Sequence, residues 1–231
     1  MKIKFVSGLE HQQDAVEAIV DIFKGQEVCT SNFTVFSPEY INKQYRTTEN
    51  NLGFANKLQI NEAQIIDNAQ KIQLRNGLRP SLSSEIDINN LDFSIEMETG
   101  TGKTYVYLKT IMEMQRQYGF KKFIIVVPSI PIKEGVFKSL QMTVDHFNEH
   151  YPEAVYNEKS FFVYDSSDLS SVRDFAINDS LQIMVINIQA FAKDIDETAA
   201  KTNRILLDYN DKLGYKPISL LQNTRPFVIV D

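Results

Sequence analysis

The sequence predicts an α/β fold with a mainly parallel sheet flanked by helices, and two observations carry that prediction. Short apolar runs with little alternation, typical of strands covered on both faces, recur after the first third of the chain. Segments with apolar residues at helical spacing lie between these runs. Strand and helix therefore alternate, which indicates parallel strands joined by helical crossovers.

The expected elements follow from these patterns. Strands are expected at Phe93–Glu96, Phe123–Val127, Phe161–Tyr164, Ile183–Ile188 and Phe227–Val230. Helices are expected at Leu9–Phe23, Asn61–Arg75, Gly102–Tyr118, Ile132–His150 and Leu169–Asn178, with a further helical segment around Arg204–Leu213. We expect three regions: an N-terminal helix (1–28), a polar segment that is an insertion or surface subdomain before the phosphate loop (29–90), and an α/β domain (91–231), in which the polar stretch 192–224 lies on the surface.

Composition narrows the function classes. With 24 Lys and Arg against 30 Asp and Glu the net charge is -6, so any contact with nucleic acid must be local. The one cysteine, Cys29, cannot form an internal disulfide and is expected to be a buried small hydrophobe. No signal-like or membrane-spanning stretch occurs, which favours a reducing cytoplasmic setting without a membrane partner. His11, His146 and His150 lack metal-ligand spacing and are expected to be surface or helix residues.

The most specific signal is the string Met97-Glu98-Thr99-Gly100-Thr101-Gly102-Lys103-Thr104, where an expected strand gives way to an expected helix. The glycines let consecutive backbone N–H groups face one anion, and the helix adds its positive N-terminus. Lys103 would contact the β- and γ-phosphates of ATP, and Thr104 would ligate Mg²⁺. The usual pattern begins with glycine where this chain has Met97, a departure common in helicase-type ATPases; the alternative is a glycine-rich turn with a solvated lysine.

A second nucleotide motif is indicated by the apolar strand Phe227–Val230, which runs into Asp231. An acid at that place would hold Mg²⁺ opposite Thr104, usually through water. A strand that ends in aspartate is also common by chance. The phosphate loop upstream favours the magnesium interpretation, so Lys103 and Asp231 are the predicted catalytic residues, and Thr104 and Asp231 the predicted metal ligands.

The residues resemble superfamily 2 helicases, and more closely the Res subunit of type III restriction enzymes. The phosphate loop is shared with many helicases, whereas two other groups of residues single out the Res family. They are Pro128-Ser129 with Ile132-Lys133-Glu134-Gly135-Val136, and Asn187-Ile188-Gln189-Ala190-Phe191. The resemblance implies a RecA-like P-loop NTPase lobe, the N-terminal ATPase lobe of such a subunit.

The resemblance also assigns roles to residues outside the phosphate loop. Gln12 is similar to the family's adenine-reading glutamine, although a glutamine on a helix is otherwise a solvated side chain. Pro128, Ser129 and Gln189 resemble segments that touch the nucleic-acid backbone through a hydroxyl or exposed N–H groups. The alternatives are a strand that ends at proline and an ordinary loop after a buried strand. Together with Gln12, the loop residues Thr99, Gly100, Thr101, Gly102, Lys103 and Thr104 form the expected nucleotide site.

By the same resemblance, the complete protein would couple ATP hydrolysis to DNA translocation and cleavage, with a methyltransferase modification subunit as partner. A second ATPase lobe and a nuclease find no counterpart here, so the chain is expected to be a fragment that hydrolyses ATP barely or not at all. Three alternatives stay open: the first lobe of a DNA or RNA helicase without nuclease, a P-loop enzyme of another class, and a non-catalytic nucleotide-binding fragment. A GTPase is disfavoured because no Asn-Lys-x-Asp string is present.

Overall fold

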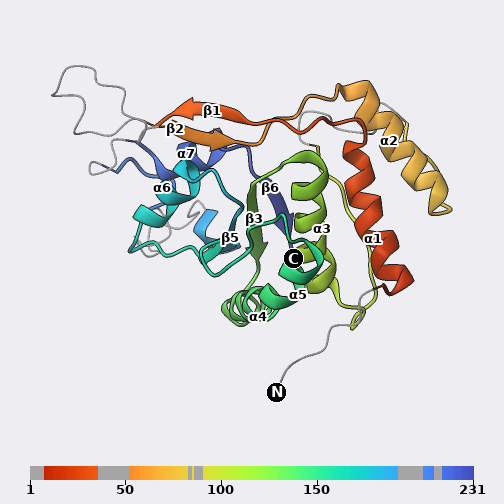
Figure 1. Cartoon of the computed structure of the whole chain (residues 1–231). Helices are drawn as coiled ribbons and strands as arrows, with labels where there is room; N and C mark the ends of the chain where they lie inside the picture. The colour runs from red at the N-terminus through yellow and green to blue at the C-terminus, as the bar shows by residue number, and fades with distance from the viewer. Residues whose placement is uncertain (1–7, 36–51, 83–84, 86–90, 192–204, 211–214) are drawn as a thin grey trace. The chain divides into compact units, whose positions relative to one another are not determined.

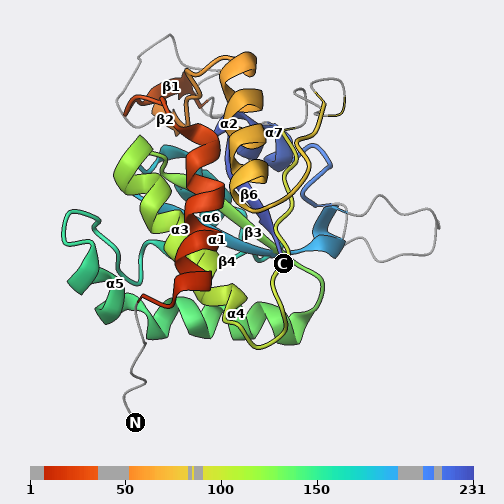
Figure 2. The ribbon, with the colours of Figure 1, turned by 90° about the vertical axis from the view of Figure 1, so that its right-hand side faces the viewer.

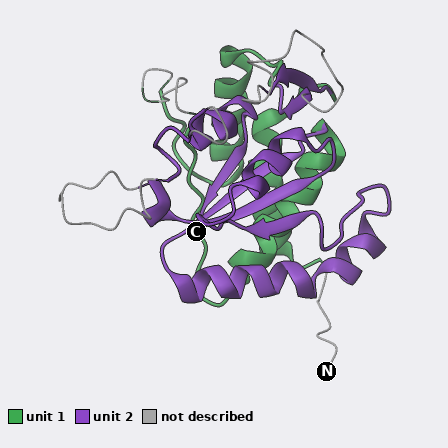
Figure 3. Ribbon diagram, turned by 90° about the vertical axis from the view of Figure 1, so that its left-hand side faces the viewer, with its two compact units in different colours: residues 1–28, 58–118 green, residues 29–57, 119–231 purple. Residues whose placement is uncertain are grey.

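The computed structural model describes residues 8–35, 52–82, 85, 91–191, 205–210 and 215–231. The chain forms two compact units, each assembled from two separate stretches of sequence (Figure 3). Unit 1 comprises residues 1–28 and 58–118, and unit 2 comprises residues 29–57 and 119–231. No described helix is long and apolar enough to cross a membrane.

Unit 1 is helical. Its elements are α1 (Glu10–Val20), continued by the 3-10 turn η1 (Asp21–Phe23), then α2 (Glu62–Arg75) and α3 (Lys103–Tyr118). Both views show α1 beside α3 (Figures 1 and 2), and the Tyr118 hydroxyl donates to the Val20 carbonyl over 3.0 Å. Burial, and to a smaller extent the nearby Asp21 carboxylate, raise the pKa of Tyr118 to about 12.

The three helices expected in unit 1 are confirmed, and their ends show why the sequence specifies them. The Asn61 side chain accepts from the Gln64 backbone while the Gln64 side chain accepts from the Asn61 backbone, a capping box at the start of α2. After the α1–η1 segment, Gly25 has φ 98°, a conformation that a Cβ would strain. Local signals in the sequence therefore begin and end these helices.

The expected strand at Phe93–Glu96 is wrong. This stretch has no regular secondary structure, and three of its four side chains, Ser94, Ile95 and Glu96, are exposed. Its apolar residues suit a strand, but a strand exists only when its backbone N–H and C=O groups pair with a neighbour. No described strand pairs with it.

Unit 2 contains the sheet. Its strands are β3 (Lys122–Val127), β4 (Phe161–Val163), β5 (Gln182–Asn187) and β6 (Phe227–Val230), in the spatial order β4-β5-β3-β6. All three neighbouring pairs are parallel, with Val126 opposite both Ile186 and Val230. The predicted α/β class with a parallel sheet is confirmed, and the central strands β3 and β5 are buried on both faces.

Helices of unit 2 cover the two faces of this sheet. On one face lies α4 (Ile130–Met142), where the Phe137 ring meets the Phe161 ring at a centroid distance of 5.6 Å. On the other face, α6 (Ser170–Ile177) and α7 (Pro217–Asn223) pack against alternate strand residues such as Ile124 and Met184. Side chains that alternate along a strand thus supply two separate cores.

The helix expected over Ile132–His150 is divided into α4 and α5 (Val144–His150). The break falls at Thr143, whose hydroxyl donates to the carbonyls of Ser139 and Leu140 at 2.8 and 3.1 Å. A threonine that bonds back to the preceding turn competes with the helical ladder, which accounts for the division.

Unit 2 also contains a hairpin that was not expected, in which β1 (Ser31–Thr34) and β2 (Leu52–Ala55) pair antiparallel. Val35, directly after β1, is buried in the core beneath α6 and α7. Cys29 is half-buried rather than buried, and its thiol donates to the Lys57 carbonyl at 3.4 Å. The predicted boundaries 1–28, 29–90 and 91–231 differ from those of the compact units and stay a sequence-level prediction.

The surface placement of 192–224 is wrong for its described part. Leu206, Leu220 and Leu221 are buried in the same core, the latter two on the unforeseen helix α7. The helical segment expected around Arg204–Leu213 is a turn over its described residues, closed by a bridge between Asn210 and Tyr215. The rest of that segment lies outside the described residues.

Candidate functional site

The phosphate loop of unit 1 has the backbone that an anion site requires. Gly100 has φ 82° and Gly102 has φ 89°, conformations that L side chains rarely adopt. Among the described residues, no carbonyl accepts from the N–H groups of Gly100, Thr101 or Gly102. Helix α3 begins at Lys103, so its first N–H groups also lack partners within the helix. Successive free donors at a helix N-terminus form a cradle for a phosphate group.

The side chains of this loop fit Mg-ATP. Lys103 is exposed, and its ammonium makes a long contact of 3.3 Å with the Glu98 carbonyl. The Thr101 hydroxyl donates to the same carbonyl at 2.7 Å and fixes the loop internally. Thr104 follows in the first turn of α3 and offers a hydroxyl of the kind that ligates Mg²⁺. An ammonium held this weakly is available to a phosphate, which offers a stronger charge-assisted bond.

Gln12 lies beneath the phosphate loop. The side chain is 8% exposed, and its amide nitrogen donates to the Thr101 carbonyl over 2.8 Å. A Cβ added at Gly102 would stand 2.6 Å from this nitrogen. Glycine at this position avoids strain in the backbone and leaves room for the Gln12 amide. The solvated alternative for Gln12 does not fit its burial, and the adenine-reading role stays a prediction.

His11 also reaches the phosphate loop. Its Nε2 atom lies 3.3 Å from the Thr101 carbonyl oxygen, the atom that Gln12 holds from the same helix. His11 is exposed, as the sequence predicts, but it is not free of the site. Its position directly before Gln12 was the only signal that could have indicated this contact.

The other predicted residues meet at the carboxyl edge of the sheet in unit 2. Pro128 and Ser129 follow β3, Gln189 follows β5, and Asp231 follows β6. The Asp231 N–H donates to the Val126 carbonyl at 3.0 Å, which continues the β3–β6 ladder by one residue. Because parallel strands end at the same edge, these residues share the edge where ligands bind in open α/β sheets.

Ser129 is one of the predicted nucleic-acid contacts at this edge. It is the N-cap of α4, yet its hydroxyl makes no capping bond, and Pro128 before it is exposed. Gln189 is exposed, and its N–H donates to the Asn187 side-chain oxygen at 2.9 Å. The Asn187 amide nitrogen is buried and has no described partner. Asn187 lies within the family-like string that ends in Phe191, but sequence reasoning did not single it out.

The electrostatics of this edge are mixed. Asp165 follows β4, and its carboxylate accepts from the N–H and hydroxyl of Ser167, both at 2.8 Å. These bonds, with a smaller effect of the Lys133 ammonium on α4, lower the pKa of Asp165 below its ordinary value. Burial, and to a smaller extent the Asp165 carboxylate, raise the pKa of the adjacent Tyr164 to about 12. Lys133 is thus a cation at the edge that carries Ser129.

The predicted site residues therefore fall into two groups. Gln12 and the loop 99–104 come together in unit 1, whereas Pro128, Ser129, Gln189 and Asp231 come together in unit 2. Among the described residues, no group of three or more His, Cys, Asp and Glu side chains could hold a metal ion. A magnesium ion would have to share its ligands with the nucleotide phosphates, as the phosphate-loop chemistry implies.

Comparison with known proteins is decisive for the family. The family model described as "Type III restriction enzyme, res subunit" matches residues 6–231. The chain belongs to this family. It is a helicase-like domain of the type III restriction Res family, as the resemblance of its motifs indicated.

Curated relatives agree with the family model. The chain is 26% identical to the Res subunit of the type III restriction-modification enzyme EcoP15I of Escherichia coli, over 96% of the chain and 22% of that protein. It is 28% identical to the EcoPI Res subunit of Escherichia phage P1, over 98% of the chain and 23% of that protein. It is 35% identical to the StyLTI Res subunit of Salmonella typhimurium, over 63% of the chain and 15% of that protein. The chain thus spans less than a quarter of the length of each.

Proposed function

We propose that this Res-family chain is the Mg-ATP-binding motor lobe of a type III restriction endonuclease. The observation that carries the proposal is the phosphate loop, in which Gly100 and Gly102 hold positive φ while Lys103 and Thr104 open α3. A glycine-rich turn with a merely solvated lysine would not need a buried Gln12 against the Thr101 carbonyl. The complete protein would couple ATP hydrolysis to DNA translocation and cleavage.

Each residue has a defined task in this proposal. The N–H groups of Gly100, Thr101 and Gly102 bind phosphate oxygens, and Lys103 leaves Glu98 to contact the β- and γ-phosphates. Thr104 and Asp231 would hold Mg²⁺. Bound Mg²⁺ would neutralise charge on the transferring phosphoryl group. Catalysis by such a site is mainly positioning and electrostatic stabilisation.

DNA is the proposed second ligand, contacted at the carboxyl edge of unit 2. Ser129 offers an uncommitted hydroxyl, Gln189 an exposed amide, and Asn187 a buried amide nitrogen without a described partner. Contacts of this type position a protein on the phosphate backbone without reading sequence. Such local contacts suit a chain with a net charge of -6. A methyltransferase modification subunit is the proposed partner, and a reducing cytoplasm the proposed setting.

Calorimetric titration with Mg-ATP tests the nucleotide part. We expect measurable binding by the chain and a loss of about tenfold or more in Lys103→Ala, because a charge-assisted contact contributes about 1.5–3 kcal/mol. Lys109→Ala, on the same helix, is the matched control and should leave affinity unchanged. Tight binding that Lys103→Ala does not alter would contradict the proposal, as would an absence of binding by the unmodified chain.

A further inference from the structure

Two neighbouring side chains of α1 converge on one carbonyl oxygen of the phosphate loop. The Gln12 amide nitrogen is 2.8 Å and the His11 Nε2 atom 3.3 Å from the Thr101 oxygen. A carbonyl oxygen has two lone pairs, so it can accept both bonds. Because a carbonyl offers no hydrogen, His11 takes part only with a proton on Nε2.

The geometry of the peptide bond transmits this hold to the anion site. In a trans peptide the C=O and the following N–H lie in one plane and point in opposite directions. Thr101 supplies the carbonyl and Gly102 the N–H of the same peptide unit. Two donors that hold the Thr101 oxygen toward α1 therefore direct the Gly102 N–H away from α1. That N–H donates to no described carbonyl and is free for a ligand.

We propose that His11 is a positioning residue of the phosphate loop, whose ring N–H acts with Gln12 to orient the Gly102 N–H toward the phosphates of a bound nucleotide. This inference rests on the proposed nucleotide-binding function. Gln12 is 8% exposed and makes the buried hydrogen bond to the Thr101 carbonyl, while His11 is exposed and makes the outer one. His11 stabilises the binding-competent loop before the nucleotide arrives, which lowers the ordering cost of binding.

Substitutions at His11 separate the donor from the size of the ring. His11→Phe keeps a ring and removes the N–H, whereas His11→Gln supplies an amide N–H in its place. Gln13→Ala, one position on in α1, is the control because its exposed amide donates to Glu17 instead. In Mg-ATP titrations we expect His11→Phe to weaken binding about three- to tenfold, the effect of one hydrogen bond, and His11→Gln to restore most of it.

Amide hydrogen exchange in the nucleotide-free chain tests the hold independently of binding. We expect faster exchange at the Thr101 to Thr104 amides in His11→Phe, with exchange near that of the original protein in His11→Gln and Gln13→Ala. If the unmodified chain binds no Mg-ATP, the proposed function fails, while the exchange comparison still tests His11. If it binds and His11→Phe changes neither affinity nor exchange, or His11→Gln fails to rescue both, the positioning role is overturned.

Discussion

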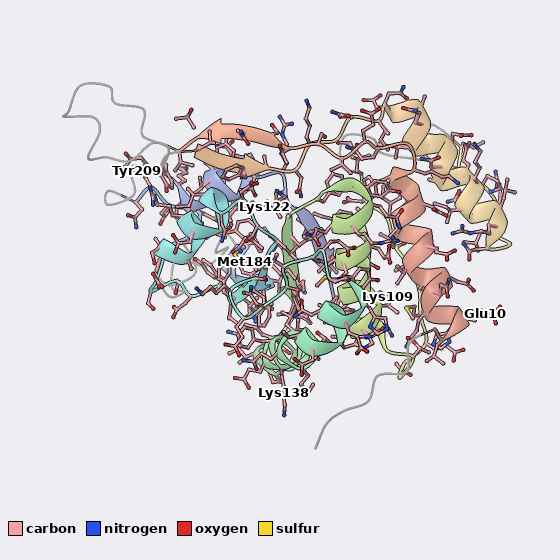
Figure 4. All side chains as sticks on the ribbon, in the orientation of Figure 1. Glu10, Lys109, Lys122, Lys138, Met184 and Tyr209 are labelled. Carbon is pink, nitrogen blue, oxygen red and sulfur yellow. The ribbon has the colours of Figure 1, made fainter. Side chains whose placement is uncertain are left out.

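Two lysines of this chain occupy opposite environments. Lys103 in the phosphate loop is exposed, and its ammonium has one contact of 3.3 Å to the Glu98 carbonyl. Lys122, which is labelled in Figure 4, stands at the start of β3. It is fully buried, and its ammonium donates to the carbonyls of Phe175 and Asn178 at the end of α6. The Phe175 ring lies 5.3 Å from the same nitrogen.

The difference separates a lysine available for a ligand from a lysine used for structure. Moving the Lys103 ammonium to a phosphate costs little free energy, because its present contact is long and the side chain is exposed to solvent. Lys122 fills the acceptors of a helix C-terminus, where a cation or a donor is favourable. Lys103 belongs to a motif, and its role was predicted, whereas Lys122 directly precedes an ordinary apolar run, and its role was not predicted.

The largest expected loss of stability follows from substitution of Asn56, which binds the backbone around Lys122. Its side-chain oxygen accepts from the N–H groups of Lys121 and Lys122 at 2.9 and 3.1 Å, and its amide donates to the Lys122 carbonyl at 2.8 Å. Pro226, which lies directly before β6, has no N–H and so cannot donate to the Lys122 carbonyl in place of Asn56. Asn56→Ala should therefore lower the free energy of unfolding by about 3 kcal/mol, about 1 kcal/mol for each lost bond.

Urea unfolding measures this loss in unit 2. Asn32→Ala, an exposed asparagine of the same hairpin, is the control and should change stability by less than about 0.5 kcal/mol. Equal losses in the two variants would show that Asn56 does not tie the hairpin to β3.

The next largest expected loss of stability follows from substitution of Gly102 in the phosphate loop, directly before Lys103. Both glycines have a positive φ, 89° at Gly102 and 82° at Gly100. A Cβ at Gly102 would lie 2.6 Å from the Gln12 side-chain nitrogen, whereas a Cβ at Gly100 would lie in open space. Gly100→Ala should cost about 1 kcal/mol from the strained backbone alone. Gly102→Ala should cost about 2 kcal/mol, because it also displaces Gln12 from the Thr101 carbonyl.

Mg-ATP affinity and thermal unfolding of both alanine variants test this difference. Adding Gln12→Ala to Gly102→Ala removes the overlap, so the double variant should lose little more than Gly102→Ala itself. Indistinguishable effects of the two glycine substitutions would mean that Gln12 does not support the loop.

Sequence reasoning succeeded where a local signal decides the structure. The helices α2 and α3 and the apolar runs of β3 and β5 are each specified by adjacent residues. It failed where distant residues decide. Phe93–Glu96 has the apolar character of a strand but no partner, and α7 is buried because Leu220 and Leu221 meet α6. His11 contacts a residue 90 positions away, and Asn56 contacts residues 65 and 66 positions away, which no periodicity could show.

The last prediction concerns how the buried Lys122 makes protein stability depend on pH. Burial lowers the pKa of Lys122 from 10.5 to about 7; the Asp179 carboxylate opposes this shift and the Lys121 ammonium adds to it. Between these values the unfolded chain binds a proton that the folded protein does not. Stability contributed by this group therefore rises with pH, by up to about 1.4 kcal/mol per pH unit, and is constant below about pH 7.

Lys122→Met removes this titration, so its free energy of unfolding should rise less steeply with pH than that of the original protein. Urea midpoints between pH 7.5 and 9.5 measure the two slopes, over a window that lies between the folded and unfolded pKa values. Lys138→Met, an exposed lysine of α4 (Figure 4), should keep the original slope. The neutral amine of Lys122 still has two N–H donors for its two carbonyls, so α6 keeps its bonds while the charge is lost. An unchanged slope in Lys122→Met would show that the buried ammonium keeps its proton throughout, held by these carbonyls and Asp179.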